Sequence, residues 1–279
     1  MTYSELYEYG VKAFRKAGIG ECETDAELLL EFTFDTNRAD RILKRNLEVS
    51  QEKEKEYKAY IDKRSQHVPC QYITGIQGFM GLEFEVSSYT LIPRFDTEIL
   101  VETVLKELND AMKILDMCTG SGCILLSLLK YSNFTEGLGV DISAEALKVA
   151  KRNAKRLGIK VDFIESDLFE KVEGKFDIIV SNPPYIKSGE IKELMPEVRD
   201  YEPVIALDGK EDGLYFYKKI IKEAGNFLFG GGLLCFEIGC DEGLLVKSLM
   251  EEADFRDIEI IKDLCGLDRV IKGRKKINV

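Results

Sequence analysis

Residues 176–185 join an apolar run to a compact polar motif, Asn-Pro-Pro-Tyr. Residues 176–180 are almost all apolar and rich in β-branched types, which predicts a buried strand and not a helix. Two consecutive prolines end the strand, because proline cannot donate a ladder hydrogen bond. Asn182 is therefore expected at the carboxyl end of a buried strand, where open α/β sheets bind their ligands. Together with Tyr185 it forms a polar socket with one flat wall, which suits a planar, uncharged amine or amide.

A glycine loop follows an earlier strand. Residues 114–122 predict a strand that runs through a loop containing Gly120 and Gly122 into a helix, and the two glycines let the backbone approach a ligand closely. Asp141 ends the next strand, where its carboxylate can accept hydrogen bonds from both hydroxyls of a ribose. Leu125 occupies the place of the third glycine of the dinucleotide fingerprint, which argues against NAD or FAD. A nucleoside without a pyrophosphate fits better, and S-adenosylmethionine is the expected cofactor.

A further strand ends at Ser166. The Asp167 carboxylate can accept a hydrogen bond from the amino group of adenine, while Leu168 and Phe169 can pack against its ring. Loops from four strand ends thus converge at one edge of the sheet. An ordinary proline turn or a plain strand–helix connection explains each motif alone, but the spacing of the set is more specific than any member. The expected cofactor-binding residues are Cys118, Thr119, Gly120, Ser121, Gly122, Asp141, Asp167, Leu168 and Asn182.

The elements that position these loops alternate between strand and helix, which indicates an α/β protein with a doubly wound, Rossmann-like parallel sheet. Residues 144–157 give the clearest helix, with Ser143 as its cap and Gly158 as its stop. The tail of the chain adds two strands and ends in a basic cluster that is expected to be solvated. The seven expected strands are 113–117, 137–140, 161–165, 176–181, 232–238, 255–261 and 269–272.

The N-terminal part of the chain predicts a small helical domain. Thr2 with Glu5, and Thr24 with Glu27, match the capping box that satisfies free amides at a helix start. Gly18 is a plausible end for the first helix. Further along, apolar residues alternate with glutamates at 82–86, as in a half-exposed hairpin strand. The expected domains are a helical domain (1–68), a β-hairpin linker (69–93) and the α/β domain (94–279).

Composition narrows the class of protein. An apolar content of 45% and a charged content of 32% predict a globular chain, and no apolar run approaches the roughly 20 residues of a membrane span. The chain starts without a secretory pattern, so a cytoplasmic protein is expected. Seven cysteines without a Cys-x-x-Cys pair, and the single histidine His67, predict free thiols and no metal site. A net charge of −11 argues against direct nucleic-acid binding and suits a basic protein partner.

Taken together, these motifs resemble class I S-adenosylmethionine-dependent methyltransferases, of which Asn-Pro-Pro-Tyr marks the members that methylate amino or amide nitrogen. Three further segments, 71–75, 91–98 and 202–209, together with Asp268-Arg269-Val270-Ile271 and the helical N-terminus, resemble the peptide chain release factor glutamine methyltransferase (PrmC/HemK) family over essentially the whole chain. Cys118 stands where that family often has glycine, so a displaced, thiol-sensitive loop is expected there.

The resemblance implies methyl transfer to the glutamine of the Gly-Gly-Gln loop of a class I release factor, with 1–68 as the substrate-recognition domain and 94–279 as the S-adenosylmethionine-dependent methyltransferase domain. A monomer is expected. An amide nitrogen is a poor nucleophile, and acceptors for both of its N–H groups would orient it and oppose the positive charge that forms. The Asn182 side-chain oxygen and the Pro183 carbonyl are suitable acceptors, and Tyr185 can pack on the flat amide. Asn182, Pro183 and Tyr185 are thus the expected catalytic residues, and together with Pro184 they form the expected substrate site.

Two alternatives stay open on the residues alone. An adenine-N6 methyltransferase of DNA or RNA uses the same Asn-Pro-Pro-Tyr socket, although the acidic total charge and the lack of a basic, aromatic-interleaved segment weigh against it. The second alternative is a non-catalytic module that binds S-adenosylmethionine and a protein partner. The intact Asn-Pro-Pro-Tyr socket weighs against it, because such a module would have no need of Asn182.

Overall fold

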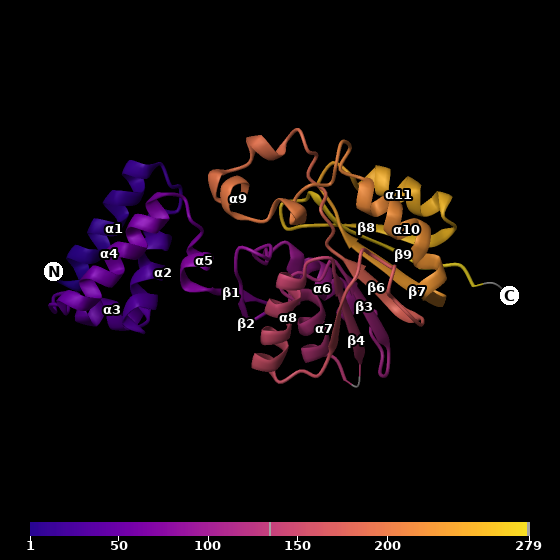
Figure 1. Cartoon of the computed structure of the whole chain (residues 1–279), viewed down its shortest axis with the longest axis horizontal. Helices are drawn as coiled ribbons and strands as arrows, with labels where there is room; N and C mark the ends of the chain where they lie inside the picture. The colour runs from indigo at the N-terminus through magenta and orange to yellow at the C-terminus, as the bar shows by residue number, and fades with distance from the viewer. Residues whose placement is uncertain (134, 278–279) are drawn as a thin grey trace. The chain divides into compact units, whose positions relative to one another are not determined.

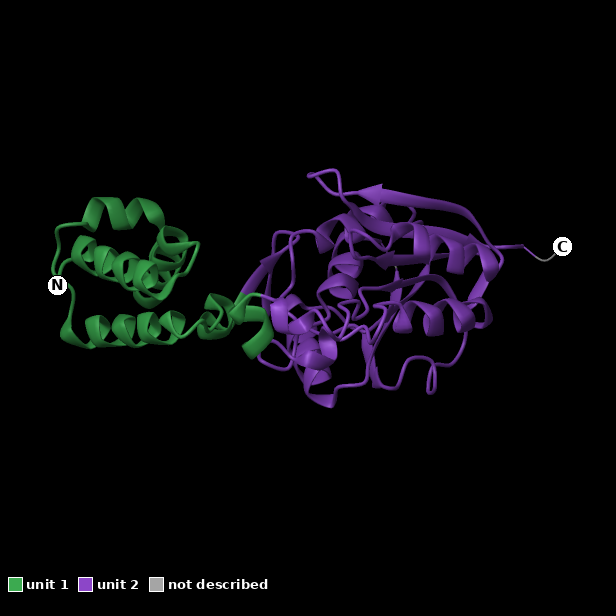
Figure 2. Ribbon diagram, turned by 90° about the horizontal axis from the view of Figure 1, so that it is seen from above, with its two compact units in different colours: residues 1–76, 195–201 green, residues 77–194, 202–279 purple. Residues whose placement is uncertain are grey.

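The computed structural model describes residues 1–133 and 135–277, which form two compact units (Figure 2). Unit 1 contains residues Met1–Ile76 and, from far along the chain, the segment Met195–Tyr201. Unit 2 contains Gln77–Leu194 and the residues from Glu202 onward. Residues 195–201 therefore belong to unit 1, although the residues on either side of them in the sequence belong to unit 2.

Unit 1 is a helical bundle with its own apolar core. Leu6 and Phe14 of the first helix pack against Leu29 and Leu30 of the second and against Tyr57 of the fourth, and all five side chains are buried. A shared core of this kind allows helices of ordinary length to be stable, because isolated helices are marginal in water. The helices are α1 (Tyr3–Ala17), α2 (Cys22–Phe34), α3 (Arg38–Lys44), α4 (Gln51–Ser65), α5 (Cys70–Thr74) and α9 (Pro196–Tyr201), the last of which lies in the segment 195–201.

One of the two predicted capping boxes is confirmed. The Thr2 hydroxyl accepts from the backbone of Glu5, whose carboxylate accepts in return from the backbone of Thr2, and Gly18 ends α1 in the left-handed conformation. The box at Thr24 is wrong, because α2 already begins at Cys22 and its N-cap makes no side-chain hydrogen bond. Acidic residues in the first turn of α2 instead complement the positive end of the helix dipole.

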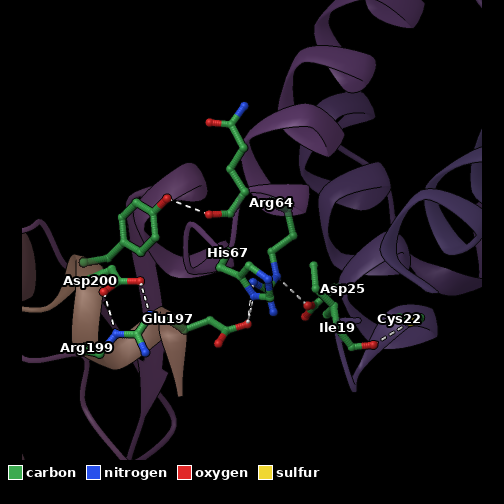
Figure 3. Close-up of polar contacts among 10 residues, drawn as sticks. Ile19, Cys22, Asp25, Arg64, His67, Glu197, Arg199 and Asp200 are labelled. Carbon is green, nitrogen blue, oxygen red and sulfur yellow. Dashed lines mark hydrogen bonds and ion pairs between the residues drawn. The ribbon is translucent and has the colours of Figure 1, made fainter. Parts of the chain in front are cut away.

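The α9 segment is attached to α4 through a partly buried ion-pair cluster around the buried Arg64 (Figure 3). Arg64 donates from Nε to Asp25 Oδ2 at 2.7 Å and from Nη1 to Glu197 Oε1 at 3.0 Å. His67 Nδ1 lies 3.1 Å from the same Glu197 oxygen. His67, the single histidine, was predicted to lie at the surface or to have a structural role, and its contact with Glu197 agrees with a structural role.

Unit 2 is built on one seven-stranded sheet with strand order β5-β4-β3-β6-β7-β9-β8. Strands β3 to β7 run parallel, whereas β9 is antiparallel to both of its neighbours. The predicted parallel, doubly wound sheet is confirmed for β3 to β7, and the two predicted tail strands add an antiparallel edge, because the short connection from β8 to β9 favours antiparallel pairing. The strands are β3 (Lys113–Met117), β4 (Glu136–Asp141), β5 (Asp162–Glu165), β6 (Phe176–Ser181), β7 (Leu228–Glu237), β8 (Phe255–Lys262) and β9 (Asp268–Lys275).

Helices cover both faces of this sheet, as the doubly wound prediction requires (Figure 1). Along β3, Ile114 packs into one core with α6 (Thr97–Leu105), α7 (Cys123–Tyr131) and α8 (Ala144–Leu157). The next residue, Leu115, packs into the other core with α10 (Tyr215–Phe227) and α11 (Gly243–Glu252). Successive side chains of a strand point to opposite faces of the sheet. Because helices cover both faces, both sets of side chains are buried, and the strands are therefore continuous apolar runs in the sequence.

The hairpin of β1 (Ile76–Phe79) and β2 (Leu82–Glu85) is present as predicted. It is tied to the sheet domain by Asn153 of α8, which is fully buried. The Asn153 side chain accepts from Glu85 N at 2.7 Å and donates to Glu85 O at 3.0 Å and to Ser121 O at 2.9 Å. One neutral amide thus holds the hairpin and the glycine loop together.

Two expectations near the end of the chain were wrong. Strand β7 begins at Leu228 and not at residue 232, because the glycines at 230–232 form an irregularity within the strand and not a turn before it. The basic cluster at the end of the chain is not simply solvated, since Lys272 and Arg274 both pair with the Glu107 carboxylate.

Candidate active site

The glycine loop lies where the strand order reverses, between β3 and β6, which is the place where doubly wound sheets bind ligands. Three of its residues have positive φ, namely Cys118 (63°), Gly120 (56°) and Gly122 (80°). Glycine adopts this conformation without strain, whereas cysteine does not. The strained Cys118 stands at the position where the resembled family often has glycine.

The surroundings of Cys118, which is partly exposed, change the acidity of its thiol. Desolvation by the neighbouring protein, followed by the nearby Asp141 and Asp116 carboxylates, raises the pKa of the thiol well above its ordinary value. A thiol that stays protonated is a weak nucleophile. The expected thiol sensitivity of this loop stays a prediction.

Asp116, the last but one residue of β3, is completely buried beneath the loop. Its Oδ2 accepts from Thr119 Oγ1 at 2.5 Å, while its Oδ1 has no hydrogen-bond partner among the described residues. Burial raises the pKa of this carboxyl to about 7, although the Thr119 hydrogen bond opposes the shift. The carboxyl group beneath the loop therefore has one oxygen that lacks a hydrogen-bond partner among the described residues.

Asp141 is held rigidly at the end of β4. Its Oδ2 accepts from Gly120 N at 2.8 Å and its Oδ1 from Ser143 N at 2.9 Å. Burial raises the pKa of Asp141, and the backbone hydrogen bonds from Ser143 and Gly120 oppose that rise. Each carboxylate oxygen keeps a further lone pair, so the side chain can still accept from a ligand.

A cavity of about 290 Å³ opens over these residues, and most of the expected site lines it. Its apolar walls include Ile142, Leu168 and Phe216, which suits the flat ring of a nucleoside. Gly122, Pro183 and Tyr185 are expected site residues that do not line it. The expected residues that do line it are Cys118, Thr119, Gly120, Ser121, Asp141, Asp167, Leu168, Asn182 and Pro184.

The Asn182 side chain is oriented at the edge of this cavity. Its Nδ2 donates to the hydroxyl of Thr97 at 3.5 Å, which leaves the side-chain oxygen as the acceptor available to a ligand. The residue before it, Ser181, donates from Oγ to Met117 O at 2.6 Å and so ties the end of β6 to the end of β3. Two neighbouring strands thereby fix the start of the Asn-Pro-Pro-Tyr loop.

The other end of that loop is fixed by segment 204–209. Ile186 N donates to Leu207 O at 2.9 Å, and Gly209 N donates to Ile186 O at 2.8 Å. A Cβ on Gly209 would lie 2.7 Å from the backbone of Tyr185, closer than real Cβ contacts come, so only glycine fits there. The Tyr185 hydroxyl points to the carboxylate of Glu237 at the end of β7, 3.4 Å from Oε1.

Sequence reasoning missed several residues that the structure brings to the site. Arg94, Thr97 and Glu202 lie in segments 91–98 and 202–209, whose sequence resembles the family but predicts no role for these three side chains. Glu202 is buried, accepts from Ile92 N at 3.1 Å and pairs with Arg94. A buried glutamate directly before a proline was a usable signal, because such a charge needs a partner. Asn153 and Glu237 carried no local signal.

No group of three or more His, Cys, Asp or Glu in residues 1–133 and 135–277 could hold a metal ion. Over the same residues, none of the helices has the length and apolar character needed to traverse a lipid bilayer. The cysteines are free thiols.

Family models match both parts of the chain, a PrmC N-terminal domain over residues 5–75 and a methyltransferase small domain over residues 94–197. A release factor glutamine methyltransferase of Clostridium acetobutylicum is 46% identical over 254 residues, covering 88% of this chain and 89% of the relative. One from Clostridium botulinum is 40% identical over 282 residues, covering 99% of this chain and 100% of the relative. The chain belongs to the release factor glutamine methyltransferase family. It is therefore an enzyme, a methyltransferase, with a helical PrmC-type domain before its sheet.

Solved structures support the fold of this methyltransferase. A methyltransferase from Pyrococcus furiosus matches with a TM-score of 0.55 at 20% identity, covering 80% of this chain and 99% of that chain. A Thermus thermophilus 16S rRNA methyltransferase, solved with AdoMet and guanosine, matches with a TM-score of 0.51 at 18% identity, covering 72% of this chain and 50% of that chain. At these identities the likeness shows the Rossmann-like methyltransferase fold and nothing finer.

Proposed function

We propose that this enzyme transfers a methyl group from S-adenosylmethionine to the side-chain amide nitrogen of the glutamine in the Gly-Gly-Gln motif of class I peptide chain release factors. The observation that carries the proposal is the orientation of Asn182, whose side-chain oxygen is left to a ligand at the edge of the cavity. Membership in a family whose curated relatives are named release factor glutamine methyltransferase supports the choice of substrate.

The cavity has the groups that S-adenosylmethionine requires. Asp141 would accept from the ribose hydroxyls, Asp167 from the adenine amino group, and the glycine loop 118–122 would let the backbone approach the ligand. The position of Gly120 fits this role, because a side chain there would meet no protein atom and would project into open space. The cofactor supplies a methyl group already activated by the positive charge of its sulfonium.

The remaining residues act on the glutamine. Asn182 Oδ1 and the Pro183 carbonyl accept from the two amide N–H groups, which turns the nitrogen toward the methyl donor and opposes the charge that develops on it. Pro184 and Tyr185 restrict the flat amide to one orientation. Alignment of the two reactants supplies much of the rate, and the proton of the methylated amide is acidic enough to leave to water without a histidine base.

The helical part of the chain is proposed to recognise the protein substrate. In this scheme residues 1–68 bind the release factor, 69–93 form the linker and 94–279 carry out the transfer. A net charge of −11 suits a basic partner surface and disfavours direct contact with nucleic acid. The enzyme is proposed to act as a monomer on one release factor at a time.

A transfer assay tests the proposal. The enzyme is incubated with S-adenosylmethionine and either a class I release factor or the same factor with the motif glutamine replaced by alanine. We expect methylation of the first and none of the second. Asn182→Ala should abolish transfer while leaving cofactor binding nearly unchanged. Methylation of an adenine-containing oligonucleotide in place of the release factor would overturn the proposal.

A further inference from the structure

Unit 2 presents large apolar side chains to solvent from three segments that lie far apart in the sequence. Phe95 is 73% exposed, and Val204 and Ile205, which belong to a short 3₁₀ helix, are 53% and 55% exposed. In the turn between β8 and β9, Leu264 is fully exposed and Leu267 is 48% exposed. Single exposed apolar residues are normal, whereas a contiguous group of them marks an interaction surface.

A buried glutamate joins the first two of these segments. Glu202, which is 4% exposed, accepts from Ile92 N at 3.1 Å and pairs with Arg94, the residue before Phe95. Val204 follows two residues after Glu202. Phe95 and Val204 are therefore brought to the same part of the surface, although the paired residues Arg94 and Glu202 are 108 positions apart in the sequence.

An arginine joins the third segment to the first. Arg269 Nη2 lies 3.3 Å from Asp96 Oδ2 and 3.2 Å from Asp263 Oδ2. Asp96 directly follows Phe95, and Asp263 directly precedes Leu264. The guanidinium thus holds the two exposed apolar residues near each other through their neighbours in the chain.

The turn that carries Leu264 is closed by its own hydrogen bonds. Asp263 Oδ1 accepts from Cys265 N and from Leu267 N, both at 2.9 Å, and Asp263 N donates to Leu267 O at 2.8 Å. These bonds fix the backbone without any packing of the leucine side chain. Leu264 is therefore held in solvent by a defined turn, and little conformational entropy is lost when a partner covers it.

The exposed residues form a surface that we call the apolar strip, which consists of Phe95, Val204, Ile205, Leu264 and Leu267. The strip begins at the cavity, because Ile205 also lines the cavity. Thr97, two residues after Phe95, lines the cavity as well and accepts from Asn182 Nδ2 at 3.5 Å. The strip therefore leads outward from the place where the substrate amide would be held.

The chemistry of the Gly-Gly-Gln motif indicates what covers the strip. Two of the three residues have no side chain, so the motif offers an enzyme one amide and little apolar area. Apolar burial is the dominant favourable term in most protein association, so residues beside the motif must supply much of the binding. When the glutamine reaches Asn182, the chain on either side of it leaves the cavity where Ile205 and the strip begin.

The charges along the strip favour a protein over a nucleic acid as its partner. Arg94 and Arg269 are both paired with carboxylates, and Lys262 at the end of β8 pairs with Asp268 at 2.8 Å. Cations engaged in this way are poorly placed to neutralise phosphates, which supply most of the affinity of proteins for nucleic acid.

We propose that the apolar strip is a docking surface for apolar residues of the release factor that flank its Gly-Gly-Gln loop. The strip contributes to substrate affinity and not to the chemical step. It gives a role to segments 91–98, 202–209 and 268–271, whose polar residues hold it in place. This proposal rests on the proposed function, because it takes the release factor as the protein substrate.

Two serine variants test the proposal in the full-length enzyme. Phe95→Ser and Leu264→Ser change exposed side chains, so both variants are expected to fold as wild type does. We expect KM for a full-length class I release factor to rise by about 10-fold in each, as for the loss of an apolar anchor from an interface. Because binding and not the transition state is affected, kcat should stay within about twofold of wild type.

Phe229→Ser is the matched control. Phe229 is 44% exposed and lies near the start of β7, at the end of the sheet opposite the carboxyl edge that holds the cavity. Its substitution should leave KM unchanged. An unchanged KM in Phe95→Ser and Leu264→Ser, or an equal rise in all three variants, would overturn the proposal.

Direct binding separates this proposal from the proposed function. The dissociation constant of the enzyme–release factor complex, measured by calorimetry with S-adenosylhomocysteine in place of the methyl donor, should rise in Phe95→Ser and Leu264→Ser by the same factor as KM. Binding with this sensitivity but without methyl transfer by wild type would contradict only the proposed function. Methyl transfer with a KM that is insensitive to both substitutions would contradict only the docking surface.

A second copy of the enzyme is the rival occupant of the strip. Analytical ultracentrifugation should show a monomer for wild type and for both serine variants. A wild-type dimer that Phe95→Ser or Leu264→Ser converts into a monomer would overturn the proposal, because the strip would then bind another copy of this chain.

Discussion

The partly buried carboxylates of unit 1 and the fully buried carboxylates of unit 2 have opposite surroundings. In unit 1, Asp25 and Glu197 share the guanidinium of Arg64, and hydrogen bonds from the Glu197 backbone, His67 and Arg64 outweigh burial to lower the pKa of Glu197. In unit 2, Asp116 and Glu237 each have a buried oxygen without a partner among the described residues, and burial raises the pKa of both.

The difference separates two uses of buried charge. A carboxylate that is matched by a cation anchors one chain segment to another, as Glu197 anchors α9 to α4. A carboxylate buried without a matched partner costs stability, and a fold keeps such a group where it serves a site. Asp116 and Glu237 stand at the carboxyl ends of β3 and β7, the two strands that flank β6 and its Asn-Pro-Pro-Tyr loop, which fits the second use.

The largest effect on stability is expected from Arg64→Met. The substitution leaves the partly buried Asp25 and Glu197 without their cation, so the free energy of unfolding should fall by about 2 to 3 kcal/mol, somewhat less than for a fully buried ion pair. Thermal or denaturant unfolding measures the change. Arg15→Met, which breaks the exposed pair with Glu23, is the control and should have little effect. Equal effects of the two variants would show that the Arg64 cluster does not anchor α9.

Asn153→Ala should have the next largest effect. The change leaves Glu85 and Ser121 with buried backbone groups that lose their partners, and about 2 kcal/mol of unfolding free energy should be lost. Because one of those groups lies in the glycine loop, the affinity for S-adenosylmethionine should weaken as well. A loss of stability with unchanged affinity would show that the loop is held by other contacts.

Asp116→Asn should raise the free energy of unfolding, whereas the two preceding substitutions lower it. The pKa of Asp116 is about 7 in the folded protein and near 3.8 when unfolded, so the folded state binds the extra proton between these values and stability falls as the pH rises through them. The neutral variant removes this penalty, and at pH 8 its unfolding free energy should exceed that of wild type by at least about 1 kcal/mol. Unfolding curves at pH 5 and pH 8 measure the difference, which should be smaller at pH 5.

The smallest effect is expected at Cys118. Cys118→Gly relieves the positive φ and should be more stable than Cys118→Ala, which keeps the strained backbone, by about 1 kcal/mol. Comparison of the two variants removes the common loss of the thiol. A Cys118→Ala variant as stable as Cys118→Gly would show that the loop carries no strain at this residue.

Local signals in the sequence predicted the elements that hold the site. Strands β3 and β6 and helix α8 have the predicted bounds, because apolar runs ended by glycine or proline, and a serine cap with a glycine stop, act within a few residues. The predicted start of β7 was wrong, because three consecutive glycines, which resemble a turn in the sequence, lie within the strand.

The rest depends on contacts between distant residues, which a single sequence does not encode locally. The attachment of α9 to α4 joins residues more than 130 positions apart (Arg64 to Glu197, 133). The Glu237 contact with Tyr185 and the Asn153 contact with Glu85 span 52 and 68 positions. The convergence of Asn182 and the glycine loop could be predicted only because the topology of parallel sheets brings strand ends together.

The most direct test measures stability and rate together in Glu237→Gln and Arg64→Met. The account predicts that Glu237→Gln keeps or raises the melting temperature while kcat for release factor methylation falls at least about 10-fold, because Glu237 contacts the Tyr185 hydroxyl. It predicts the reverse for Arg64→Met, a lower melting temperature with an unchanged kcat below that temperature. If Glu237→Gln instead lost melting temperature and rate together, as a structural ion pair would, the distinction between the two kinds of buried carboxylate would be wrong.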